Sequence, residues 1–150
     1  MTLARTWSVG LVGVQGAMVE VEVDLAAGVP QVVLVGLPDA VVRQSLDRVR
    51  AAVVNAGADF PLRRVTIGLS PASMPKQGSG FDLALAASVL AAAGTVPRRS
   101  VDRLVLLGEL GLDGSVRGIR GVLPAVLAAL RAGHRQVVVP RANADEAALV

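Results

Sequence analysis

The sequence contains no cysteine and no tyrosine, and it has one tryptophan, two phenylalanines and one histidine. Without cysteine the chain forms neither a disulfide nor a thiolate metal site. The lone histidine, His134, lies near a predicted helix end and has no second imidazole to share a metal with, so we expect no metal site. With so few aromatic rings, the sequence also predicts no stacking platform for single-stranded bases.

Long apolar runs are missing as well, because glycine, proline or a charged residue interrupts every stretch before it reaches the roughly 18 residues that span a bilayer. The first ten residues, MTLARTWSVG, lack the basic region and apolar core of a signal peptide. We therefore expect a soluble, cytoplasmic protein without a membrane partner. At 150 residues, 53% of them hydrophobic, the chain is long enough for one domain with a single core.

Charge restricts the function only weakly. The formal net charge is +3, and all but one of the 15 basic residues are arginines spread along the chain. The single lysine is Lys76. This balance permits a nucleic-acid surface without requiring one.

Strand and helix patterns alternate along the chain. Val19, Val21 and Val23 alternate with acidic residues in residues 17–25, the two-residue period of a half-exposed strand. Residues 7–14 read as its hairpin partner. Further strands are predicted in QVVLVGL, RRVTIGLS and RQVVVP.

Helix and turn signals separate these strands. A helix is predicted over residues 40–56, capped by Asp39, and a second one from Asp82, placed as its cap, to about residue 93. Asp113-Gly114 predicts a hairpin in which both turn residues have positive φ. Pro124 suits the first turn of a third helix. The chain stops inside a helix that has barely begun, so we expect the parent protein to continue.

The loop SMPKQGSGFD, which carries Lys76, has three interpretations. A Walker A phosphate loop would place the lysine after the glycines, whereas Lys76 precedes Gly78 and Gly80, and Asp82 would oppose a phosphate. Exposed glycine amides can still form an anion nest of another kind. A serine and lysine nucleophile pair would need Ser79 and a desolvated Lys76 to meet, and the sequence gives no sign that Lys76 is buried. On chemistry alone a structural loop is favoured.

Two segments, VGLPDAVVRQSLDRVRAAVVNAGADFPLRRVTIGLSPASMPKQGSGFDLALAASVL and GELGLDGSVRGIRGVLPAVLAA, resemble the N-terminal domain of the ComM/YifB family. These proteins are magnesium-chelatase-related AAA+ ATPases linked to branch migration of DNA in recombination and natural transformation. The resemblance implies that residues 1–150 form one domain ahead of an ATPase module. It also implies that the parent binds ATP and magnesium and forms hexameric rings around DNA. This chain, which lacks that module, is expected to hold no cofactor.

The family domain is similar in fold to the proteolytic domain of Lon protease. The resemblance therefore implies an α+β fold, a mixed sheet with helices mainly on one face, as in Lon proteolytic domains and ribosomal-protein domain 2. Carried onto this sequence, the Lon serine falls on Gly80 and the Lon catalytic lysine on Leu123. Glycine has no hydroxyl to attack a peptide bond, and leucine has no amine to accept a proton. Ser79 is one residue away from the serine position, and Lys76 matches the loop lysine of Lon and not its catalytic lysine. We expect no peptidase activity.

Two roles from different classes remain at this point. In the first, the domain is a noncatalytic module that supplies subunit contacts or guides DNA, with Arg117 and Arg120 as the candidate contacts to phosphate or to a neighbouring subunit. In the second, it is a degenerate hydrolase or phosphate-binding domain with an active loop at Lys76, Gly78 and Ser79.

Overall fold

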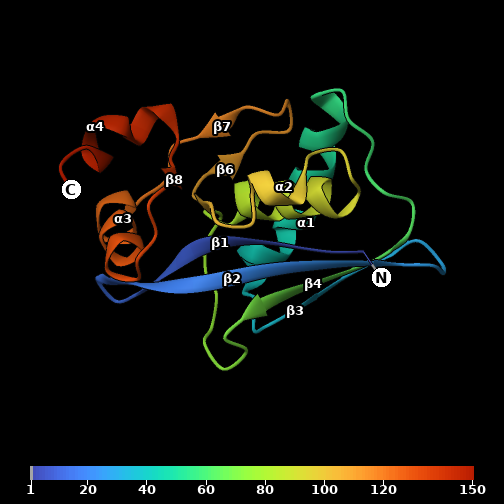
Figure 1. Ribbon diagram of the computed structural model, residues 1–150, viewed down its shortest axis with the longest axis horizontal. Helices are drawn as coiled ribbons and strands as arrows, with labels where there is room; N and C mark the ends of the chain where they lie inside the picture. Colours follow the sequence, from blue (N-terminus) through green and yellow to red (C-terminus); the bar gives the residue numbers. More distant parts are fainter. Residues whose placement is uncertain (1) are drawn as a thin grey trace.

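The computed structural model describes residues 2–150, which build a mixed sheet of six strands in the order β3-β4-β2-β1-β5-β8 (Figure 1). The strands are β1 (Thr2–Val12), β2 (Gln15–Ala26), β3 (Gln31–Val35), β4 (Arg64–Ser70), β5 (Val105–Leu106) and β8 (Val137–Val138). A separate two-stranded ribbon consists of β6 (Glu109–Leu110) and β7 (Val116–Arg117). The helices are α1 (Ala40–Asn55), α2 (Asp82–Ala92), α3 (Val122–Arg131) and α4 (Ala144–Ala147), with short 3-10 turns at Arg98–Ser100 and Arg141–Asn143.

The centre of the sheet is the long antiparallel pair β1 and β2. Val19, Val21 and Val23 of β2 are completely buried, while the acidic residues between them are half-buried on the other face, as the alternation predicts. Strand β4 pairs antiparallel with β2, whereas β3, β5 and β8 join through parallel pairings. The sheet is therefore mixed, and the expected fold class is confirmed.

The two longest helices, α1 and α2, lie on the face of the sheet that carries the buried valines (Figure 1). Helix α2 is apolar on nearly all sides because it lies between the sheet, α1 and β6. Helix α3 packs instead on the alternate side chains at the far end of β1 and β2, where Val9, Ala125 and Ala129 belong to a second core cluster. Helices α2 and α3 thus bury different sets of β1 and β2 side chains.

The predicted start of α1 is confirmed. Asp39 has extended backbone angles and its carboxylate accepts a hydrogen bond of 2.7 Å from the amide of Val42. Asp82, however, does not cap α2. Phe81 is the capping residue and offers no side-chain acceptor, while the completely buried Asp82 carboxylate binds Arg48 of α1 and the amide of Leu110.

The hairpin predicted at Asp113-Gly114 forms between β6 and β7, but its turn differs from the prediction. Gly114 has a φ of 90°, whereas Leu37 is the one residue other than glycine with positive φ among residues 2–150, so Asp113 is in an ordinary conformation. The turn is longer than two residues, since the amide of Gly111 donates to the carbonyl of Ser115 across 2.8 Å. None of the helices within the described residues has the length and apolar character of a membrane span.

Candidate functional site

A groove of about 580 Å³ lies where the end of β1, the loop of residues 77–81 and the segment of residues 118–121 meet. Gly78, Ser79, Gly80 and Arg120 all line it. The structure therefore brings together four of the residues that the sequence singled out, from segments about forty residues apart. Lys76 and Arg117 are outside this lining.

The loop is attached to the start of α1 by backbone pairing. The amide of Lys76 donates to the carbonyl of Leu37 and the amide of Asp39 donates to the carbonyl of Lys76, each at 2.9 Å. The second carboxylate oxygen of Asp39 accepts from the amide of Gly78 at 3.2 Å. Asp39 thus caps α1 and fixes the glycine loop at once, a link that the sequence could not reveal because the two segments are distant in the chain.

These contacts argue against the anion-nest interpretation. The Gly78 amide, which a phosphate would need, already binds the Asp39 carboxylate, and Asp39 itself lines the groove. The first turn of α3 is occupied in the same way, since the amide of Leu123 donates to Oε2 of Glu146 at 2.9 Å. A phosphate at the Gly78 amide would meet the Asp39 carboxylate, and a phosphate at the first turn of α3 would meet the Glu146 carboxylate.

Lys76 is completely buried, contrary to the sequence, which gave no sign of it. Its ammonium group donates a hydrogen bond to the carbonyl oxygen of Pro71, and burial lowers the pKa of the amine below its ordinary value. Among the hydrogen bonds of residues 2–150 there is none between Lys76 and Ser79. The lysine is desolvated as a nucleophile pair would need, but its amine is directed to a backbone carbonyl.

Gly80 and Leu123 are the residues onto which the resemblance to Lon protease places the two catalytic positions. A Cβ atom added to Gly80 would lie 3.2 Å from Cδ1 of Ile119, so a serine there would meet an apolar neighbour instead of a base. Leu123 is half-buried in the first turn of α3 and lies outside the groove lining. The groove lining, taken over residues 2–150, contains Ser79 and Asp39 but no lysine or histidine.

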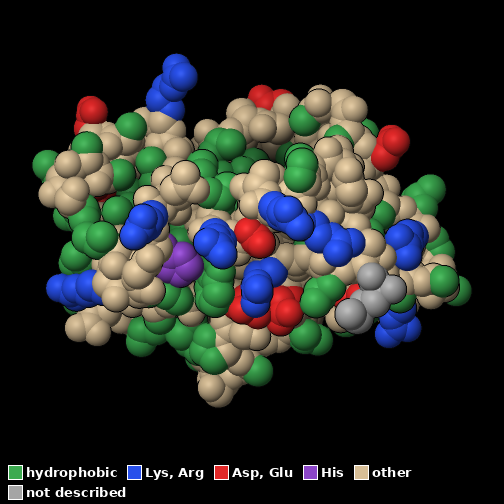
Figure 2. Space-filling view, viewed as in Figure 1, with side chains coloured by type: hydrophobic (Ala, Val, Ile, Leu, Met, Phe, Trp, Pro, Cys, Tyr) green, Lys and Arg blue, Asp and Glu red, His purple; other side chains and the backbone are tan. Residues whose placement is uncertain are grey.

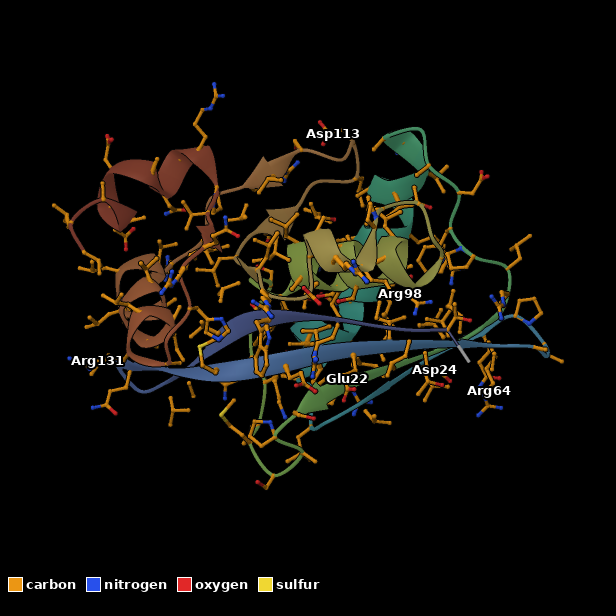
Figure 3. All side chains as sticks on the ribbon, in the orientation of Figure 1. Glu22, Asp24, Arg64, Arg98, Asp113 and Arg131 are labelled. Atoms are coloured by element: carbon orange, nitrogen blue, oxygen red, sulfur yellow. The ribbon has the colours of Figure 1, made fainter. Side chains whose placement is uncertain are left out.

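Arg117 and Arg120 do not form one site. Arg120 is exposed at the groove. Arg117 is exposed on β7 beside the hairpin turn. There the hydrogen bonds from Ser115 lower the pKa of Asp113, and the charge of Arg117 adds to this effect (Figure 3 labels Asp113 at the tip). Within the described residues no three histidine, aspartate or glutamate side chains gather as metal ligands.

Comparison with known proteins places these features in context. Residues 21–143 match the family described as subunit ChlI of Mg-chelatase. Over its full 150 residues the chain is 55% identical to the uncharacterized protein Rv2897c of Mycobacterium tuberculosis, covering 30% of that protein. It is 41% identical to competence protein ComM of Haemophilus influenzae and 36% identical to YifB of Escherichia coli, again over its full length, and covers 29% of each. The chain thus spans less than a third of the length of these relatives.

A more distant match concerns the protease that the fold resembles. The chain is 32% identical over 138 residues to the Lon protease of Roseiflexus castenholzii, a stretch that includes 87% of the chain and 17% of the protease.

Proposed function

Because the chain belongs to the family of subunit ChlI of Mg-chelatase, we propose that it is a noncatalytic module of a larger cytoplasmic AAA+ protein related to ComM. In this proposal the ATP and magnesium chemistry resides in a module beyond the 150 residues. The residues present do not fit a nucleotide phosphate, since the Gly78 and Leu123 amides are both bound to carboxylates. The module then contributes to DNA handling or to assembly of a hexameric parent.

The observation that carries the proposal is the position of Gly80 beside Ile119, where a Lon-type enzyme would need its nucleophile. Ser79 lines the groove without a hydrogen bond to the amine of Lys76. Without a base to take its proton, a serine hydroxyl is a poor nucleophile. A peptidase assay with unfolded casein should give no turnover above buffer. Casein hydrolysis that disappears in Ser79→Ala would favour the degenerate hydrolase instead.

Two forms of the noncatalytic role have separate support. DNA guidance is favoured by the exposed Arg120 at the groove and Arg117 on β7, since arginine pairs well with phosphate. A salt-dependent titration of duplex DNA, repeated with both residues changed to alanine, tests it. Loss of binding and a smaller salt slope are expected if these arginines contact phosphates.

Assembly is favoured by exposed apolar side chains around the edge strand β3. Leu62 is 84% exposed, Val29 78% and Val54 54%, and Leu62 and Val54 line a cavity of about 710 Å³ beside this strand. Large exposed apolar areas are typical of protein contacts. Sedimentation velocity over a concentration series should show association that Leu62→Asp prevents, whereas a monomer at every concentration would contradict an assembly role for this surface.

A further inference from the structure

The only tryptophan and the only histidine of the chain lie against each other. The ring centroids of Trp7 and His134 are 5.4 Å apart and their planes are inclined by 57°. Trp7 lies on β1 among the residues packed around the second core cluster, and His134 follows the end of α3. The small number of aromatic residues predicts no stacking platform, whereas the fold brings two aromatic rings together.

Backbone hydrogen bonds position both residues. The amide of Trp7 donates to the carbonyl of Leu104 at 3.1 Å, which holds this part of β1 to the start of β5. Gly133, with a φ of 89°, ends α3, and the amide of His134 donates back to Ala129 at 3.0 Å. This turn directs the chain from the end of the helix across the indole ring, so the aromatic pair is built on regular secondary structure.

A cavity of about 500 Å³ opens beside these rings. Its lining consists of Trp7, Arg103, Gly133, His134, Arg135 and Gln136. Two guanidinium groups thus flank two aromatic heterocycles, and no carboxylate belongs to the lining. The neighbouring cavity at Arg5 and Arg98, in contrast, also contains Glu22 and Asp102. Figure 2 shows basic side chains on either side of the histidine on this face.

We propose that this pocket, the Trp7 pocket, binds one nucleotide unit of single-stranded nucleic acid. A base packs against the indole of Trp7, and Arg103 and Arg135 pair with the adjoining backbone phosphates. The proposal deepens the DNA-guidance form of the proposed function and rests on it. It places the nucleic acid at a different surface from Arg117 and Arg120.

The chemistry of the lining selects this partner. Arginine forms paired hydrogen bonds with phosphate oxygens, and every base offers a π-face that an indole can stack on without regard to sequence. The cavity volume falls in the range of about 300–1,000 Å³ that is usual for small-molecule sites. An acidic polypeptide would satisfy the arginines but would leave the indole face without a planar partner.

The chain offers a direct probe of this pocket. Because Trp7 is the only tryptophan and tyrosine is absent, excitation of tryptophan reports on Trp7 alone. We expect a short oligothymidylate or oligouridylate to quench this fluorescence at low salt. Arg103→Ala and Arg135→Ala should weaken binding, and each should reduce the slope of log K against log salt by about 0.7 because one phosphate is no longer neutralised.

Arg64→Ala is the matched control, since it removes one exposed arginine far from the pocket. On β2, Ala26 is the partner of Arg64 and Glu20 is the partner of Trp7. These two positions are six residues apart along the strand, so Arg64 lies far from Trp7. Figure 3 shows Arg64 at the opposite end of the sheet from Arg131, the last residue of α3. This variant should bind like the parent. Trp7→Leu, followed by anisotropy of a labelled oligonucleotide, should bind about five- to a hundredfold more weakly because the indole no longer stacks on a base.

Several results would overturn the proposal. Binding of the labelled oligonucleotide without any change in Trp7 fluorescence would exclude stacking, as would equal quenching by an abasic oligonucleotide. Equal affinity for polyglutamate would show an acidic-protein site instead. If Arg64→Ala weakens binding as much as Arg103→Ala, the binding is not local to the pocket. Absence of binding would end this inference but would leave the noncatalytic proposal intact, because that depends on the casein assay.

Discussion

The guanidinium group of Arg48 on α1 holds the carboxylate of Asp82, the first residue of α2. Nε donates to Oδ2 at 2.7 Å and Nη2 donates to Oδ1 at 3.1 Å, and Oδ2 also accepts from the amide of Leu110 at 3.0 Å. One buried charge therefore connects both helices and the β6–β7 ribbon, and the pairing raises the pKa of Arg48 above its ordinary value. Asp82 directly follows the loop of residues 77–81 that lines the candidate site.

Removal of either partner should destabilise the protein strongly. Arg48→Ala leaves the Asp82 carboxylate buried without its counter-charge, at a cost of about 3–5 kcal/mol in the free energy of unfolding. Urea denaturation measures this cost. Arg5→Ala, which breaks the exposed pair with Glu20 at 3.4 Å, is the control and should cost less than about 1 kcal/mol. Equal costs for the two variants would contradict a buried role for Asp82.

The burial of Lys76 should be visible in alkaline solution. Burial lowers the pKa of its amine, so between the lowered pKa and the ordinary value of 10.5 the folded protein binds fewer protons than the unfolded chain. The free energy of unfolding should therefore rise with pH in this window, by at most about 1.4 kcal/mol per pH unit for one proton. It should level off above 10.5, where both states are deprotonated.

The control for this effect is Lys76→Met, which keeps the apolar stem and removes the titrating group. Cysteine and tyrosine are absent and Lys76 is the only lysine. Between about pH 9 and the titration of arginine, Lys76 is therefore the one side chain that makes the free energy of unfolding depend on pH. The variant should show a flat profile and remain folded. A parent profile that is equally flat would mean that the amine is in contact with water.

Gly36 should tolerate no side chain. It has a φ of 113°, and a Cβ atom would lie 2.1 Å from the carbonyl oxygen of Leu69, a backbone atom that cannot move aside easily. Gly36→Ala should cost well over 1 kcal/mol and loosen the strand end that leads to Asp39. Gly28→Ala separates the cost of a positive φ from the cost of the close approach. Gly28 has a φ of 139°, but nothing lies within 4 Å of the added Cβ atom. Similar melting temperatures for the two variants would show that the close approach relaxes.

A serine introduced at position 80 should not create a protease. The added Cβ of Gly80→Ser lies 3.2 Å from Ile119, a close approach that costs about 1 kcal/mol or less because that side chain end can shift. The new hydroxyl still lacks a base, since the Lys76 amine binds the Pro71 carbonyl and Leu123 carries no amine. Casein hydrolysis by the variant should equal that of the parent. An active variant would show that the glycine alone accounts for the lack of turnover.

The sequence predicts those features of the fold that depend on residues close together in the chain. The valines of β2 alternate with acidic residues because one face of the sheet is buried, and the Asp39 cap needs only the three residues that follow it. The prediction for Asp82 was wrong because a half-buried arginine on α1, 34 residues away, binds its carboxylate more favourably than the free amides of its own helix do. Local capping rules contain no information on such a partner.

The candidate site could be predicted only in part. The sequence singles out Gly78, Ser79 and Gly80 by the loop motif and Arg120 as a candidate contact, and all four line one groove. The burial of Lys76 and the contact between Trp7 and His134 were not foreseen, because they depend on how distant segments pack. Single residues of a rare type give no periodic signal, so only the fold reveals what surrounds them.

The central claim, that the groove lacks a working nucleophile, is tested most directly by a serine-directed fluorophosphonate followed by intact-mass measurement. We expect the protein to keep its unmodified mass after prolonged exposure, with Ser79→Ala behaving identically. Stoichiometric addition of one probe that Ser79→Ala abolishes would contradict the noncatalytic account.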